Sequence, residues 1–169
     1  MQVIQKYIPE NEQPEWEHMI DQLDLGELHE DELVRRLSKR LSITEHRVWA
    51  EVDSGPQLNT RLLEYIKTDL KPNYKIGLLT NAARSFIERI LVDYLDLFEF
   101  VIISSDYGVV KPDPRIYEIA ISTCGYPANE ICFTDDKERN IAGATSAGMK
   151  GIVYTGLPQF KDELQKHLS

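Results

Sequence analysis

Hydrophobic residues in the first part of the chain recur every three or four positions, with charged residues between them. This spacing places apolar side chains on one face of an α-helix. The pattern predicts four helices, over residues 16–23, 33–41, 45–52 and 58–70. Thr44 is suited to cap the third helix, and Gly55-Pro56 interrupts the chain before the fourth. The first part of the chain is therefore expected to be entirely helical.

From residue 74 onward, short apolar runs alternate with helical patterns. Strands are expected over residues 75–79, 100–104, 131–134 and 151–154. Helices are expected over residues 84–94, 114–124, 140–147 and 160–168. Short, fully apolar strands separated by helices are typical of a parallel sheet covered on both faces. The predicted fold class is therefore α/β, with a boundary between the helical and α/β regions near residues 55–57.

The amino-acid composition limits the classes of binding partner that we expect. The net charge is −9, from 19 basic and 28 acidic residues, and the basic residues are scattered. A nucleic-acid partner is not expected, because binding the phosphate backbone needs a clustered basic face. No apolar run approaches the ~20 residues of a membrane span, and the first residues lack the apolar stretch of a signal peptide. We therefore predict a cytoplasmic protein without a membrane partner.

The cysteines and histidines add no chemistry to this prediction. Cys124 and Cys132 are interpreted as two core thiols, since their spacing fits neither a disulfide framework nor a metal site. The histidines are widely spaced on polar helical stretches, and we interpret them as surface residues. These are His18, His29, His46 and His167.

Two groups suited to binding an anion follow predicted strands, where ligands bind in open parallel sheets. Thr80 and Asn81 come directly after one strand. A threonine hydroxyl with nearby backbone N–H groups can hold phosphate oxygens, but Thr-Asn here is also a common helix start. Lys111 lies in Val-Val-Lys-Pro-Asp-Pro, a turn stiffened by its prolines. This lysine either neutralises a phosphate or carboxylate, or is an ordinary surface lysine.

Asp135 and Asp136 form the sharpest chemical signal. Adjacent carboxylates at the end of a buried strand repel each other unless a cation lies nearby. Hard oxygen ligands of this kind favour Mg²⁺. The alternative is that one acid caps the next helix while the other points into solvent. Asn140, about one turn later, is placed to hydrogen-bond back to the acids.

Taken in order, the motifs LLTN, VxKPDPxIY and FxDDxxxNxxxAxxxGM resemble those of the haloacid dehalogenase-like hydrolases. The resemblance covers nearly the whole chain and is closest to the group with a small helical cap. It implies a Rossmann-like parallel sheet with helices on both faces, plus that cap. Residues 1–56 would form the cap region and residues 57–169 the α/β core.

The resemblance also assigns roles. Thr80 would be the phosphate-binding hydroxyl, with Asn81 beside it. Lys111 would be the catalytic lysine that steadies both the nucleophile and the phosphoryl group. Asp135, with Asp136 next to it, would bind Mg²⁺. Enzymes of this family hydrolyse small phosphate esters or cleave carbon–halogen bonds through an aspartyl intermediate.

The chain departs from the family at one point. The nucleophile is expected in an Asp-x-Asp pair after a first strand, and no Asp-x-Asp occurs in these 169 residues. That strand normally lies between the strands predicted at 75–79 and 131–134. We expect its absence to leave two unpaired edges. Three arrangements would close this gap: entry of residues 1–8, a strand donated by a second copy in a homodimer, or direct pairing of the two strands.

Two classes of function therefore stay open. The first is a phosphate-ester hydrolase, acting on a small phosphorylated metabolite, whose nucleophile comes from residues outside this sequence or from another chain. The second is a truncated or degenerate member that binds without catalysis, with a weak or vestigial Mg²⁺ site. Dehalogenation is a third and less favoured reading, because those enzymes do not depend on the metal that Asp135 and Asp136 suggest.

Overall fold

The computed structural model describes residues 6–54 and 58–168 and divides the chain into two compact units. We call them the helical unit and the sheet unit. The helical unit contains Met1–Asn59, Asn81–Leu95 and Ile103–Gly108. The sheet unit contains Thr60–Thr80, Asp96–Ile102 and Val109–Ser169. The chain thus passes between the units several times.

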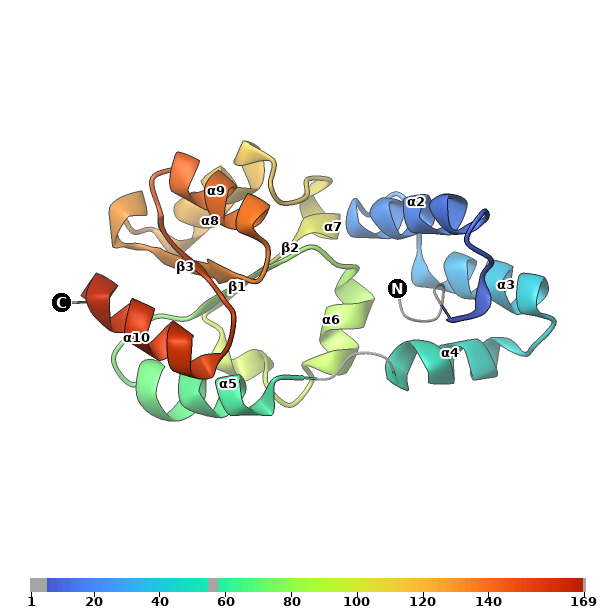
Figure 1. The fold of residues 1–169 in the computed structure, drawn as a ribbon, viewed down its shortest axis with the longest axis horizontal. Coiled ribbons are helices and arrows are strands. Elements are labelled where there is room, and N and C mark those ends of the chain that lie inside the picture. Colours follow the sequence, from blue (N-terminus) through green and yellow to red (C-terminus); the bar gives the residue numbers. More distant parts are fainter. Residues whose placement is uncertain (1–5, 55–57, 169) are drawn as a thin grey trace. The chain divides into compact units, whose positions relative to one another are not determined.

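In the helical unit, the first helices follow the predicted pattern (Figure 1). They are α2 (Gln13–Asp24), α3 (Glu30–Leu41) and α4 (Glu45–Ser54). Thr44 caps α4 as predicted, because its hydroxyl accepts a hydrogen bond from the Arg47 backbone N–H at 3.3 Å. The apolar faces meet in one core, made by Ile8, Trp16, Met19, Leu23, Leu33, Val34, Leu37 and Val48.

Two later segments complete this unit, α6 (Arg84–Ile90) and the short α7 (Ser104–Tyr107). Arg89 on α6 bonds the buried carboxylate of Glu30 at 3.1 Å and that of Asp53 at 2.8 Å. Its guanidinium also lies 4.8 Å from the centre of the Trp49 ring. Arg89 of α6 therefore contacts side chains of both α3 and α4.

The sheet unit carries the strands β1 (Gly77–Thr80), β2 (Phe100–Ile103, except its last residue), β3 (Cys132–Asp135) and β4 (Lys150–Val153). Its helices are α5 (Thr60–Tyr65), continued by a π-helix (Ile66–Leu70), then α8 (Pro114–Cys124), α9 (Glu138–Ser146) and α10 (Leu157–Leu168). Strands β3 and β4 are parallel, with Asp135 opposite Val153. The α/β class with parallel strands is confirmed.

The strands pair on either side of the gap that the sequence predicted. Within the described ranges, β1 pairs with β2 and β3 pairs with β4, as two separate two-stranded sheets. Direct pairing of β1 with β3 is therefore not how the predicted gap closes. Residues of β1 and β3 are exposed or half-buried, whereas Ile102 and Ile103 of β2 are fully buried. The expected inner strands are therefore less covered than the end of β2.

The suggested entry of residues 1–8 into that gap is also not seen for residues 6–8, the part of this segment that the structure describes. Lys6 and Tyr7 bond the carboxylate of Glu51 on α4, each at 3.0 Å. Ile8 is buried in the core of the helical unit. Residues 1–5 lie outside the described part of the chain.

Candidate functional site

A buried lysine connects the ends of two strands in the sheet unit. Thr80 ends β1 and Asp135 ends β3. The Nζ of Lys111 lies 2.9 Å from the backbone oxygen of Leu79 and 2.7 Å from Oδ2 of Asp135. The Lys111 and Asp135 side chains are only 9% and 7% exposed. This lysine is therefore not the surface residue that the sequence left open.

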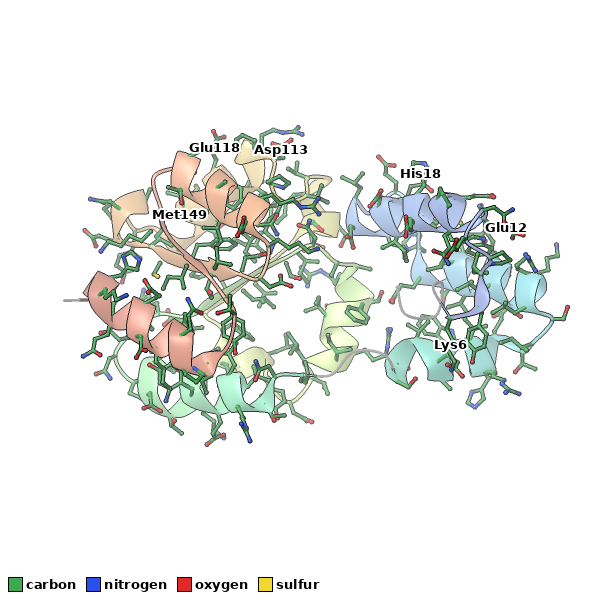
Figure 2. All side chains as sticks on the ribbon, in the orientation of Figure 1. Lys6, Glu12, His18, Asp113, Glu118 and Met149 are labelled. Carbon is green, nitrogen blue, oxygen red and sulfur yellow. The ribbon has the colours of Figure 1, made fainter. Side chains whose placement is uncertain are left out.

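The turn that carries Lys111 is fixed by the start of α8. The Asp113 N–H donates to the Val110 oxygen at 2.9 Å, which closes the turn. The Asp113 carboxylate caps α8 by accepting the Arg115 N–H at 3.0 Å, and it lies at that helix start in Figure 2. Hydrogen bonds from the Arg115 guanidinium and backbone N–H lower the pKa of Asp113 to about 2. Pro114 at the first helical position suits the same start.

Asp135 is held in its charged form by several donors. Its Oδ1 accepts the Lys137 N–H at 2.9 Å and the Asn140 side-chain amide at 2.8 Å. Burial alone raises the pKa of this carboxyl, but the Lys111 hydrogen bond and charge, with those two donors, bring it below the ordinary value. The predicted hydrogen bond from Asn140 to the acids is confirmed for Asp135.

Asn140 is itself positioned from α8. The Tyr117 hydroxyl donates to the Asn140 backbone oxygen at 2.7 Å. Tyr117 is fully buried, and its ring packs edge-on against Phe133 at 5.7 Å between centroids. Burial, with the nearby charge of Asp135, raises the pKa of Tyr117 to about 12. The hydroxyl therefore stays protonated and keeps donating. Tyr117 is the last residue of the motif VxKPDPxIY, but we predicted no role for it in the site from the sequence.

The other predicted site residues are less tightly grouped. Asp136 is exposed, so the two acids do not share one buried environment. Thr80 is half-buried in the sheet unit, while Asn81 belongs to the helical unit. The structure thus brings Lys111 and Asp135 into contact. Thr80 follows Leu79 in the sequence, and the backbone oxygen of Leu79 is the second partner of Lys111.

The groups at this site fit Mg²⁺ poorly. Magnesium takes six oxygen ligands in a near-octahedral arrangement. Asp135 offers two oxygens, but one faces the Lys111 ammonium and the other accepts two N–H groups. No group of three or more His, Cys, Asp or Glu side chains suited to a metal occurs among residues 6–54 and 58–168. Buried oxygens of Thr134 and Asn140 have no hydrogen-bond partner within the same ranges, and neither is charged.

Comparison with known proteins agrees with this architecture. A family model for haloacid dehalogenase-like hydrolases matches residues 11–148. Rat bifunctional epoxide hydrolase 2 is 25% identical over 136 residues, which are 77% of this chain and 24% of that protein. A phosphatase of Mycobacterium tuberculosis is 29% identical over 153 residues, which are 88% of this chain and 63% of the phosphatase. This chain thus spans less than two thirds of each relative.

Solved structures share the fold. A HAD family enzyme from Bacteroides thetaiotaomicron has a TM-score of 0.76 at 19% identity, covering 95% of this chain and 85% of that one. A structure of that enzyme with magnesium and inorganic phosphate has a TM-score of 0.66 at 21% identity, covering 78% and 71%. In the present structure, none of the helices within the described ranges has the length and apolar character to cross a membrane.

Proposed function

This chain belongs to the haloacid dehalogenase-like hydrolase family, and from that premise we propose that its sheet unit provides the phosphate-binding part of a phosphate-ester hydrolase site. The buried ammonium of Lys111 carries this proposal. It is fixed between the Leu79 oxygen and the Asp135 carboxylate, at the ends of two strands. A preorganised positive charge in a water-poor site stabilises a phosphoryl group far better than a mobile surface lysine.

We assign the remaining roles by family. The Thr80 hydroxyl and Asn81 bind phosphoryl oxygens, and Lys111 is the catalytic lysine that neutralises them. The bound molecule is a small phosphorylated metabolite. Residues 1–56 serve as the cap region and residues 57–169 as the core that carries this chemistry.

Hydrolysis by the family's route needs a carboxylate nucleophile that these residues do not supply as an Asp-x-Asp pair. We propose that the chain as given binds phosphate without turning it over. A complete site would need a strand with that carboxylate, from a further segment or from another copy. The second candidate function is a non-catalytic binding protein, which the separate pairing of β1 and β3 favours.

The same proposal predicts weak binding of Mg²⁺. Asp135 would be its main ligand and Asp136 its neighbour, but the Lys111 ammonium already compensates the charge of Asp135. We expect a dissociation constant well above the micromolar range, measured by calorimetry or by NMR shifts of the two acids. Micromolar or tighter binding would show a complete site. Binding that is unchanged in Asp135→Asn would place the metal elsewhere.

Phosphate binding itself is the direct test of the proposed function. Titration of inorganic phosphate, followed by ¹H–¹⁵N NMR, should shift the signals of Thr80 and of the Lys111 turn. Replacing Lys111 by glutamine should weaken this binding about tenfold or more, because hydrogen bonds to charged groups contribute about 1.5–3 kcal/mol.

Two further variants make this titration decisive. Lys111→Arg keeps the positive charge and should retain part of the affinity for phosphate. This variant therefore distinguishes an effect of the lost charge from an effect of impaired folding. Lys67→Gln removes an exposed lysine of the same unit and should bind like the unaltered chain. If the Lys111→Gln and Lys67→Gln variants bind phosphate equally well, Lys111 is not the phosphate-binding lysine.

A further inference from the structure

A series of hydrogen bonds within the sheet unit runs from the Tyr117 hydroxyl on α8 to the Lys111 ammonium. The hydroxyl donates to the Asn140 backbone oxygen at 2.7 Å. The Asn140 side-chain amide donates to Oδ1 of Asp135 at 2.8 Å, and Oδ2 of Asp135 accepts from Lys111 at 2.7 Å. The side chains in this series are buried. Water therefore does not readily replace a partner that is lost.

The first turn of α9 is the middle link of this series. Both donors to Oδ1 of Asp135 come from that turn, since they are the Lys137 N–H and the Asn140 side-chain amide. The Asn140 N–H also donates to the Lys137 oxygen at 2.9 Å, which closes the turn. The position of the turn thus decides how the Asp135 carboxylate faces its other partner, the lysine. The Tyr117 hydroxyl bonds this turn directly.

Close packing fixes the Tyr117 ring against α9 and β3. A Cβ at Gly143, three residues after Asn140 on α9, would lie 2.7 Å from the Cε2 atom of the tyrosine ring. A larger residue at 143 would therefore displace the ring or the helix. On its other side, the ring packs edge-on against Phe133 of β3. The Lys111 ammonium lies 5.5 Å from the centre of the same Phe133 ring, so packing as well as hydrogen bonding connects the tyrosine to the lysine.

We infer that Tyr117 is a positioning residue for the Lys111 ammonium in phosphate binding. Its hydroxyl fixes the first turn of α9, and that turn directs the Asp135 carboxylate toward the lysine. A charged group that is already oriented binds an anion with a smaller loss of freedom than one that must first be ordered. This inference rests on the proposed function, since it takes Lys111 as the phosphate-binding lysine. The alternative is a core tyrosine whose hydroxyl serves stability alone.

The experiment uses the full chain, with inorganic phosphate as the probe. Tyr117→Phe removes only the hydroxyl and keeps the packed ring. Tyr126→Phe is the matched control, because Tyr126 is an exposed tyrosine of the same unit. Two quantities are measured by ¹H–¹⁵N NMR. The first is the hydrogen-exchange rate of the Lys111 ammonium without phosphate, and the second is the dissociation constant of phosphate from the shifts of Thr80 and the Lys111 turn.

We expect Tyr117→Phe to speed exchange of the Lys111 ammonium about fivefold. It should also weaken phosphate binding about threefold to tenfold, as for loss of one hydrogen bond. Tyr126→Phe should change neither quantity. When Tyr117→Phe is added to Lys111→Gln, phosphate binding should weaken no further, because the hydroxyl acts through the lysine that has been removed.

Three results would overturn the inference. Unchanged ammonium exchange in Tyr117→Phe would show that the hydroxyl does not hold Lys111. Faster exchange with an unchanged affinity for phosphate would show that the hydroxyl serves stability alone. Equal weakening of binding with and without Lys111 would show that the effect is not carried by this lysine.

The measurements also separate this inference from the proposed function. If phosphate shifts neither Thr80 nor the Lys111 turn in the unaltered chain, the proposed function fails, and the claim of a role in phosphate binding fails with it. The exchange rate, measured without phosphate, then still shows whether Tyr117 holds the lysine. If the double variant does not fold, the comparison of Tyr117→Phe with Tyr126→Phe decides the question by itself.

Discussion

The isolated chain is expected to hydrolyse p-nitrophenyl phosphate several orders of magnitude more slowly than a complete site would. Loss of a covalent nucleophile has an effect of this size, because binding and charge stabilisation alone leave only a small residual rate. The 169 residues hold no Asp-x-Asp pair, and Asp135 is engaged by Lys111 and two N–H donors. A colorimetric assay with and without Mg²⁺ measures this rate.

Asp135→Ala is the matched variant for this assay. It removes the carboxylate that fixes the Lys111 ammonium, so it should only lower the small residual rate further. Turnover near about 1 s⁻¹, the lower end of ordinary enzyme rates, that disappears in Asp135→Ala would show that a nucleophile is present after all.

Replacing Lys111 by methionine is expected to lower the free energy of unfolding by about 3–5 kcal/mol. The change leaves Asp135 charged, buried and without its ammonium partner, and it removes a donor from the Leu79 oxygen. Denaturant unfolding curves measure the loss. Lys166→Met removes an exposed lysine from its pair with Glu163 and should leave the free energy of unfolding nearly unchanged, because exposed ion pairs contribute little. A loss from Lys111→Met no larger than that of the control would show that the pair is not buried in solution.

The same pair predicts how stability depends on pH. The folded protein holds the pKa of Asp135 below its ordinary value of 3.8. Stability from this group is therefore fully present above the unfolded pKa, and it is lost as the pH falls through the lower folded value. Other carboxylates are lowered as well, among them Asp113. The difference between the unaltered chain and Asp135→Asn isolates the contribution of Asp135, and this difference should shrink only below about pH 4.

The sequence predicted the helices well where periodicity and capping agreed. The α8 bounds, Pro114–Cys124, match the prediction, because Asp113 and Pro114 mark the start and Gly125 the end. Strands were displaced by one or two residues, since a short apolar run does not show where backbone pairing begins. Ser104, expected to end a strand, instead begins α7.

The sequence predicted the residue types of the candidate site but only one of its pairings, the hydrogen bond from Asn140 to Asp135. The order of the motifs predicted that Lys111 and Asp135 lie at the same end of the sheet. Sequence spacing could not show that they bond each other, or that Asp136 stays exposed. The separation of β1 from β3 depends on long-range backbone pairing, which local patterns do not encode. The role of Tyr117 is likewise set by a contact between distant segments.

The most direct test of the account is one NMR titration of the unaltered chain with p-nitrophenyl phosphate. Protein ¹⁵N shifts report binding, and the ³¹P signal of the ester reports hydrolysis in the same sample. We expect saturable shifts at Thr80 and the Lys111 turn while the ester signal stays intact. Release of inorganic phosphate at an enzymatic rate, or shifts confined to other parts of the chain, would contradict the claim that these residues bind phosphate without hydrolysing it.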